Sequence, residues 1–179
     1  IATYGTGPRD WLLASEIIPL DAESTWKQAV DAVLEEVQAC FDAVGPFRSL
    51  RLHGDCHTGN VLWTDAGPHF VDLDDALNGP AVQDFWMLLS GERHQRQRQL
   101  GALLDGYEQL RDFDRAELAL IEPLRTLRLV HYSAWLARRW DDPAFPQTFP
   151  WFGSSDYWRG QLQMLEEQIE AMAEPALVA

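Results

Sequence analysis

Apolar residues recur at steps of three and four through residues 21–44, which is the spacing of an amphipathic helix. Gly45 and Pro46 end this pattern, and its apolar positions are Trp26, Val30, Val33, Val37, Phe41 and Val44. Similar patterns predict a buried helix at 80–89, an exposed helix at 93–110, a long amphipathic helix at 123–140 and a final helix at 154–173. Residues 141–153, rich in proline and aromatic side chains, are expected to be irregular. The chain is therefore predicted to be mainly helical.

Two short β-prone runs interrupt the helical pattern, at residues 60–63 and 69–72. The five residues 64–68 between them predict a hairpin with a five-residue loop. If Trp63 faces His69 in this hairpin, Asn60 lies opposite Asp72, with Cβ atoms roughly 4.5–5.5 Å apart. The predicted fold class is α+β and mainly α, with this small hairpin at one edge.

The predicted hairpin places an amide and a carboxylate where they can share one cation. Oxygen ligands without a thiolate suit Mg²⁺ better than Zn²⁺. Asp55 lies five residues before Asn60, in a loop that Gly54 and Gly59 allow to turn sharply. A carboxylate held there can orient an attacking hydroxyl, so the pattern is typical of phosphoryl transfer.

The pattern His53-Gly54-Asp55-x-His57-x-x-Asn60, with Asp72 downstream, resembles the signature of the aminoglycoside phosphotransferase and choline kinase superfamily. These proteins are relatives of protein kinases. Residues 50–89, 121–125 and 142–146 resemble more closely the stress response kinase A family of bacteria, described as protein serine and threonine kinases. The resemblance covers nearly the whole chain and implies that residues 1–179 form the C-terminal helical lobe of a protein kinase-like fold.

The resemblance also implies roles for residues of the catalytic loop 53–60 and the metal-binding segment 70–75. It assigns Asp55 as the catalytic aspartate and Asn60 and Asp72 as Mg²⁺ ligands, with ATP as the phosphate donor. His53 would brace the catalytic loop. Asp84 would be a buried aspartate that tethers the backbone of this loop.

Two features depart from the protein kinase pattern. Gly54 stands where many kinases have an arginine that pairs with a phosphorylated activation loop, so control through such a loop is not expected. A kinase also needs a glycine-rich loop and a strand lysine for the phosphates. The single lysine, Lys27, lies in a helical pattern, and residues 5–8 form a glycine and proline cluster that is interpreted as a loop. The nucleotide-binding N-terminal lobe is therefore expected outside this chain, and residues 1–179 alone are expected to be inactive.

Composition adds limits on size and partners. The 179 residues, with 46% hydrophobic content and eight tryptophans, suffice for one core without a second domain. A net charge of −14 argues against nucleic acid or an anionic membrane as a partner. The expected partners are an acceptor, either a protein Ser/Thr or a small-molecule hydroxyl, and the N-terminal lobe, in a monomer. Cys40 and Cys56 form no paired framework, which fits a cytoplasmic protein.

Several motif residues have a simpler structural interpretation. His53, Cys56 and His57 lack a fourth ligand at zinc spacing, so His57 is expected to be a hydrogen-bonding residue of the loop. Asp74 and its neighbour Asp75 are further metal or water ligands, or more simply turn formers. Four arginines on the predicted helix 123–140 fit a solvated face better than an acceptor site, and residues 143–151 fit either a packed connector or the wall of an acceptor groove.

Three alternative functions remain open. A small-molecule kinase would use the same site on a different hydroxyl. A phosphatase of the haloacid dehalogenase type would use Asp72 as nucleophile and Asp74 as acid, but its required lysine after the motif is absent from the sequence. A pseudokinase-like scaffold would have no need for Asp55, Asn60 and Asp72 together.

Overall fold

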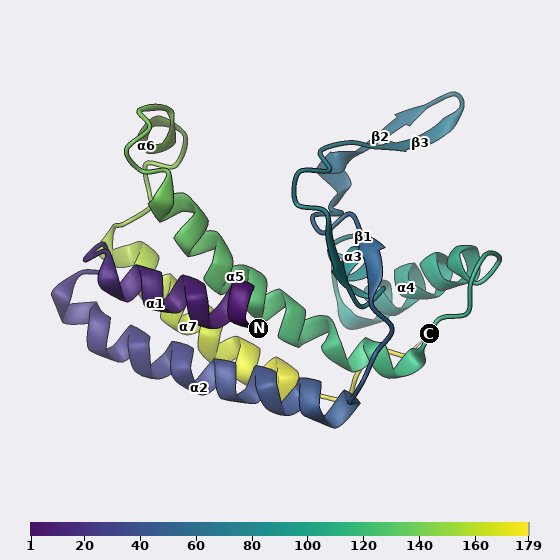
Figure 1. Ribbon diagram of the computed structural model, residues 1–179, viewed down its shortest axis with the longest axis horizontal. Helices are drawn as coiled ribbons and strands as arrows, with labels where there is room; N and C mark the ends of the chain where they lie inside the picture. Colours follow the sequence, from purple (N-terminus) through teal and green to yellow (C-terminus); the bar gives the residue numbers. More distant parts are fainter. Residues whose placement is uncertain (179) are drawn as a thin grey trace. The chain divides into compact units, whose positions relative to one another are not determined.

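The computed structural model describes residues 1–178 and is mainly helical, as the sequence predicts (Figure 1). Its helices are the π-helix η1 (Ala2–Thr6), the 3-10 helices η2 (Thr58–Asn60) and η3 (Arg115–Leu120), and the α-helices α1 (Gly7–Ala14), α2 (Leu20–Val44), α3 (Gln83–Trp86), α4 (Arg93–Tyr107), α5 (Ile121–Arg138), α6 (Ala144–Thr148) and α7 (Ser155–Ala173). Its strands are β1 (Leu50–Leu52), β2 (Val61–Thr64), β3 (Gly67–Phe70) and β4 (Leu77–Gly79).

The described chain divides into two compact units. Unit 1 comprises Ile1–Ala43 and Glu122–Glu174, and unit 2 comprises Val44–Ile121 with the segment that begins at Pro175. The interpretation of residues 1–179 as one kinase-like lobe stays a prediction, because compactness alone assigns no domain to a family. None of the helices within residues 1–178 is both long enough and apolar enough to cross a membrane.

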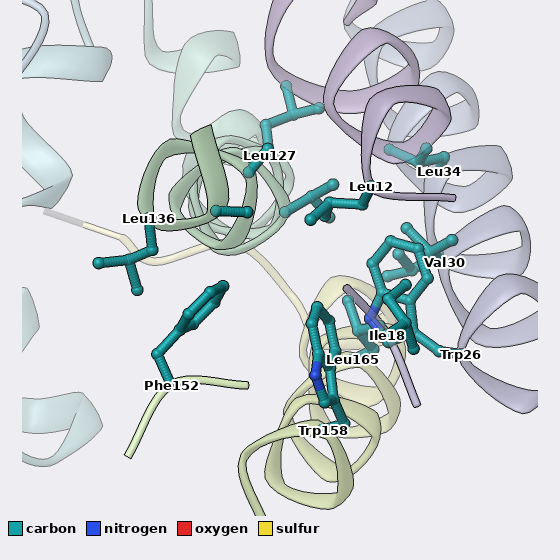
Figure 2. Packing of buried hydrophobic residues seen from close by; sticks show 14 of the residues in the cluster. Leu12, Ile18, Trp26, Val30, Leu34, Leu127, Leu136, Phe152, Trp158 and Leu165 are labelled. Atoms are coloured by element: carbon teal, nitrogen blue, oxygen red, sulfur yellow. The ribbon is translucent and has the colours of Figure 1, made fainter. Parts of the chain in front are cut away.

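Unit 1 is a helical bundle whose core is built from the apolar faces of α1, α2, α5 and α7 (Figure 1). Trp26 of α2 and Trp158 of α7 are fully buried, and their rings meet edge to face with centroids 5.7 Å apart (Figure 2). Edge-to-face contacts between aromatic rings stabilise a core beyond the area that they bury. The predicted helix at 21–44 is confirmed to within one residue, because its apolar stripe is the face that enters this core.

The N-terminal glycine cluster is helical, so its interpretation as a loop is wrong. Gly5 lies in η1, and Gly7 begins α1 with Pro8 in the first turn, where the missing amide hydrogen of proline costs nothing. A Cβ atom on Gly5 would lie 2.8 Å from Leu34 and 2.9 Å from Leu127. The glycine therefore serves close packing of helices in unit 1.

Unit 2 contains the two small sheets, each an antiparallel pair of strands. The strand β1 pairs with β4, with Leu50 opposite Gly79 and Leu52 opposite Leu77. The predicted hairpin is present as β2 and β3, drawn in blue in Figure 1, and β4 is a strand that the hydrophobic pattern did not indicate. The β1–β4 pair fixes the start of the predicted catalytic loop, which leaves β1 at Leu52.

The register of the β2–β3 hairpin differs from the prediction by one residue. Trp63 faces Pro68 rather than His69, and Thr64 pairs with Gly67, so the turn has two residues rather than five. The short turn is possible because Gly67 has φ +108° and the hydroxyl of Thr64 accepts a hydrogen bond from the amide of Ala66. The expected opposition of Asn60 and Asp72 is therefore wrong, and Asn60 lies opposite Val71.

The remaining helices follow the predicted pattern with different ends. Regular helix in the predicted span 80–89 is limited to α3, with hydrogen-bonded turns on either side. The predicted spans 93–110, 123–140 and 154–173 correspond to α4, α5 and α7, and the hydroxyl of Ser154 caps α7. The irregular span 141–153 contains the short helix α6, and its aromatic rings pack on α5 through a contact of Phe145 with Trp135.

Candidate active site

The backbone of the loop after β1 is held by two side chains of α3. The carboxylate of Asp84 accepts hydrogen bonds from the amides of His53 at 2.8 Å and Gly54 at 2.9 Å. The side-chain amide of Gln83 donates to the carbonyl of Gly54 at 3.0 Å. Hydrogen bonds to a charged carboxylate are stronger than neutral ones. The start of loop 53–60 is therefore held at its amides by Asp84 and at the Gly54 carbonyl by Gln83. This is the geometry that the resemblance implies for Asp84.

Gly54 packs directly against the backbone of segment 70–75. Its φ is +88°, and a Cβ atom there would lie 2.2 Å from the carbonyl oxygen of Asp75. Both the backbone conformation and the contact exclude a side chain. The glycine that replaces the usual kinase arginine is therefore required by the packing of this loop.

Asp55 follows Gly54 and is partly buried, with its side chain 15% exposed. His57 lies beside it, with Nε2 3.6 Å from Oδ2 of Asp55. Nδ1 of His57 accepts a hydrogen bond from the amide of Gly59 at 3.0 Å, which caps η2. His57 is therefore a hydrogen-bonding residue of the loop, as expected, and in the neutral ring its proton is on the nitrogen that faces Asp55.

Asn60 closes the other end of the loop. Its side chain is buried, and its Nδ2 donates to the carbonyl oxygen of Asp55 at 3.0 Å. This bond ties the two ends of the Asp55 to Asn60 turn together. Because the NH₂ group is used in this contact, the side-chain oxygen remains as the acceptor that a metal ion would use.

His53 joins the loop to the segment that carries Asp72. Its Nε2 lies 2.8 Å from the carbonyl oxygen of Val71, and the Val71 amide donates to the carbonyl of Asn60 at 3.1 Å. A carbonyl only accepts, so Nε2 of His53 carries the proton and Nδ1 can accept from the amide of Asp55, 3.4 Å away. Val71 is thus hydrogen-bonded to both ends of the loop. Asp72 is the next residue in the chain, so its backbone starts beside the loop.

Asp72 is exposed and has φ +61°, a left-handed conformation that is uncommon for a residue other than glycine. Aspartate and asparagine tolerate it better than most residues. The conformation ends the β3 strand, so Asp72 lies outside the ladder. Strained backbone of this kind concentrates at functional sites.

The donors present fit a magnesium ion that is completed by phosphate and water. Mg²⁺ is usually held by one or two protein oxygens together with substrate phosphates, rather than by a full protein cage. Asn60 and Asp72 supply such a pair of hard oxygen donors. Among residues 1–178, no group of three or more His, Cys, Asp or Glu side chains is arranged to hold a metal ion.

Asp74 lies in the turn that follows Asp72. The amide of Ala76 donates to the carbonyl of Leu73 at 3.1 Å, so Asp74 and Asp75 are the central residues of a β-turn. Both side chains are exposed. The turn supports the structural interpretation of these two acids, and a ligand role for Asp74 stays a prediction.

Cys56 lies next to Asp55 but is buried, with 4% of its surface exposed. Burial raises the pKa of its thiol to about 11, and the negative charges of Asp84 and Asp55 contribute to the increase. A thiol with a raised pKa is a poor nucleophile at neutral pH. The geometry gives Cys56 a packing role in the loop.

Comparison with known proteins identifies the family of this site. Residues 5–121, which include the loop, the hairpin and α3, match the phosphotransferase enzyme family. The chain belongs to this family. The match covers well over half of the chain and contains every predicted site residue.

Curated relatives of this chain are named as kinases. Stress response kinase A of Salmonella choleraesuis and the serine/threonine protein kinase RdoA of Salmonella typhimurium are each 49% identical over 177 residues, which is 99% of this chain and 53% of theirs. Stress response kinase A of Escherichia coli K12 is 49% identical over 174 residues, 97% of this chain and 52% of the relative. The chain spans about half the length of these relatives and has the mainly helical architecture of a kinase C-terminal lobe.

Two side chains that support the candidate site were not singled out from the sequence. Gln83 bonds to Gly54, and the buried Glu117 accepts a hydrogen bond from the amide of Val82 at 3.1 Å. The sequence around Glu117 offered a clue to its role. Glu117 directly precedes the apolar run 118–121, and an acid in a core is rarely found unless it is paired. Gln83 gave no such signal, since a glutamine at the start of a helix is common on surfaces.

Proposed function

We propose that this chain is the catalytic half of an ATP- and Mg²⁺-dependent phosphotransferase that acts on a hydroxyl, most specifically a Ser/Thr protein kinase. One observation carries the proposal. Hydrogen bonds join the segments that carry Asp55, Asn60 and Asp72. Asp84 holds the backbone of His53 and Gly54, His53 holds the Val71 carbonyl beside Asp72, and the side chain of Asn60 binds the carbonyl of Asp55. Membership of the phosphotransferase family supports the same chemistry.

In this proposal Asp55 is the catalytic residue that orients the acceptor. Its carboxylate accepts the hydrogen of the attacking hydroxyl and directs the oxygen toward the phosphate. Asn60 and Asp72 would hold Mg²⁺, which would supply positive charge to the phosphate oxygens. His53 and Asp84 act as supports that keep the loop and the metal segment in register.

ATP binding is proposed to need the other half of a longer protein. Lys27 lies on α2 in an ion pair with Asp31, with Nζ and Oδ2 2.5 Å apart, which is not the setting of a phosphate-binding strand lysine. The curated relatives are about twice as long as this chain. We therefore expect residues 1–179 alone to transfer little phosphate.

An apolar surface in unit 2 supports contact with that other half. A cavity of about 680 Å³ beside His53 is lined mostly by apolar side chains, among them Phe70 and Leu73. The nearby hairpin exposes Trp63 with 77% and Leu62 with 52% of their surfaces accessible. Phe70 and Leu73 are themselves 54% and 60% exposed, so the apolar lining of the cavity reaches the surface, as it does at contact sites.

The acceptor is the finer part of the proposal. Two facts favour a protein Ser/Thr hydroxyl: the relative named as a serine/threonine protein kinase, and its 49% identity to nearly all of this chain. A small-molecule hydroxyl is the second candidate, because the same site could serve it. The net charge of −14 argues against nucleic acid or an anionic membrane as a partner. The two free cysteines support a cytoplasmic location. A monomer is proposed.

The test uses the longer protein with labelled ATP, Mg²⁺, protein acceptors and a panel of small-molecule alcohols. Asp55→Asn should reduce phosphate transfer by about 10²-fold or more, because it removes the acceptor for the hydroxyl proton. Asp65→Asn is the matched control, since Asp65 is an exposed carboxylate in the hairpin turn. Chelation of Mg²⁺ should abolish transfer in both the wild type and the control.

The same assay separates the alternatives. Labelled phosphoserine or phosphothreonine supports the protein kinase, and a labelled small alcohol supports the small-molecule kinase. Release of phosphate from a monoester without ATP, lost in Asp72→Asn, would establish the phosphatase instead. A wild type with neither activity favours the scaffold and overturns the proposed function.

A further inference from the structure

Glu117 is a buried acid outside the residues that the proposed chemistry uses. It lies in η3, and only 3% of its surface is exposed. Its Oε2 accepts a hydrogen bond from the amide of Val82 at 3.1 Å. Burial raises the pKa of this carboxyl, and hydrogen bonds from the backbone of Val82 and Ala81 oppose the increase while Asp114 adds to it. A buried carboxylate with backbone donors is costly to build and needs a structural reason.

The amides that Glu117 binds belong to the turn that begins α3. Two residues after Val82, the carboxylate of Asp84 holds His53 and Gly54, and Gln83 holds the carbonyl of Gly54. A single hydrogen-bonded turn connects these amides to Asp84, because the amide of Asp84 donates to the carbonyl of Ala81 at 3.2 Å. A shift of the first residues of α3 would therefore move the Asp84 carboxylate by a similar amount.

Aromatic packing also holds α3 in place. The ring of Phe85 lies 5.2 Å from that of Tyr107 and 5.5 Å from that of Phe113, centroid to centroid. These rings hold α3 against α4 and the segment before η3, but apolar contacts are not directional. The hydrogen bonds of Glu117 are directional, so they set where the first turn of α3 lies.

We propose that Glu117 is a positioning residue for phosphoryl transfer, acting through α3 and Asp84 on the backbone that carries Asp55. The link to catalysis rests on the proposed function. The structural part of the inference does not, because it concerns the hydrogen bonds from Asp84 to His53 and Gly54. Glu117 bonds to the turn before α3, and its effect on the loop is transmitted through that turn.

The first experiment compares Glu117→Gln with the wild type in the longer protein. Glutamine keeps the shape but offers an NH₂ group to one of the two backbone amides, so one bond is lost. We expect kcat to fall by about tenfold, with KM for ATP unchanged and with the native circular dichroism spectrum retained. Amide exchange at His53 and Gly54 should accelerate by about tenfold, while exchange in the buried part of α4 changes little.

The matched control is Glu108→Gln. Glu108 is also an acid of unit 2, but it is exposed and pairs with Arg115, at 2.7 Å. Its loss should leave kcat and the exchange of His53 and Gly54 within about twofold of the wild type. If Glu117→Gln does not fold, Glu117→Asp, which keeps the charge but shortens the reach, replaces it with the same expected changes.

A double-mutant cycle with Asp84→Asn tests the route of the effect. If Glu117 acts through Asp84, the double variant Glu117→Gln/Asp84→Asn should have no lower kcat than Asp84→Asn alone. Fully additive losses would overturn the inference. So would a loss of kcat in Glu117→Gln that matches only its loss of folded protein, with the exchange of His53 and Gly54 unchanged.

The outcomes also separate this inference from the proposed function. If the wild type transfers no phosphate, the proposed function fails, and amide exchange in Glu117→Gln still decides whether Glu117 positions the loop. If the wild type transfers phosphate but Glu117→Gln equals the Glu108→Gln control in both measurements, only the positioning role fails.

Discussion

Gly54 is the residue with the least freedom in the candidate site. A Cβ atom at this position would lie 2.2 Å from the backbone oxygen of Asp75, and φ is +88°. Backbone oxygen cannot move away as the end of a flexible side chain can. The contact therefore couples loop 53–60 to segment 70–75 through main-chain atoms.

Substitution of Gly54 by alanine should both destabilise and inactivate the protein. We expect Gly54→Ala to lower the free energy of unfolding by about 2–4 kcal/mol, about 1 kcal/mol for the left-handed backbone and the rest for the clash. Urea unfolding measures this change and phosphate transfer measures the loss of activity. Gly45→Ala is the matched control, because Gly45 has φ +74° and a Cβ atom there would meet no other atom within 4 Å. Equal losses in the two variants would contradict the role assigned to the Asp75 contact.

The thiol of Cys56 gives a prediction that depends on pH. Its pKa rises from 9.0 to about 11 on burial in the folded protein. Between these values the unfolded thiol ionises and the folded one does not, so stability should fall as pH rises from about 9 to about 11. Below pH 9 the thiol is protonated in both states, and this contribution to stability is complete.

Thiol labelling checks the same prediction. In a Cys40→Ser variant only Cys56 remains, and at pH 8 about one folded molecule in a thousand carries its thiolate. Labelling of the native protein should therefore be far slower than in urea and should rise with pH toward 11. Rapid labelling at pH 8 without unfolding would mean that Cys56 is accessible and ionised, against its observed burial.

At the scale of elements, the site depends on how a loop, a hairpin and a short helix are joined. Side chains that bind main-chain atoms of another element contribute to these junctions, as Asp84 and His53 do. Such bonds fix distances between elements without the need for a large shared core. The elements are short, so a change at one junction should alter function before it unfolds the unit.

His53→Phe tests the junction between the loop and the metal segment. Phenylalanine keeps a ring near Phe70 but removes the donor to the Val71 carbonyl. Because Asp72 follows Val71, the Mg²⁺ concentration for half-maximal phosphate transfer should rise by about tenfold. His69→Phe is the control, since His69 lies in the hairpin and its ring nitrogen contacts Thr64. A similar rise in both variants would point to a general effect of histidine loss.

At the scale of the whole molecule, the candidate site lies in unit 2 and the hydrophobic core that contains Trp26 and Trp158 lies in unit 1. Unit 1 contains none of the predicted catalytic, metal or supporting residues. Its role in the described chain is the stability of the helical bundle, in which Trp26 and Trp158 are fully buried.

Trp158→Ala should lower the free energy of unfolding by about 3–5 kcal/mol, because it leaves a cavity in the core beside Trp26. Urea unfolding followed by circular dichroism measures the change. Trp151→Ala removes the same side chain from a surface position, 45% exposed, and should cost much less. If the two variants lost equal stability, the central place of Trp158 in the core would be wrong.

The long helices were predictable because their evidence is local. The stripe from Trp26 to Val37 repeats at helical spacing over several turns, and α2 begins and ends within one residue of the prediction. The hairpin was recognised but its register was not, since the choice between a two-residue and a five-residue turn depended on Gly67 and Thr64. The glycine cluster at residues 5–8 was wrongly predicted to be a loop, because glycine occurs where helices pack closely as well as in loops.

The sequence by itself determined the helical class and the set of chemical groups available, because periodicity and residue type are written along the chain. Tertiary structure alone decided that β1 pairs with β4, that Gly54 meets Asp75 and that Glu117 reaches Val82. These contacts join residues about twenty or more positions apart. Their partners are chosen by how the chain folds back on itself, and no local spacing encodes that choice.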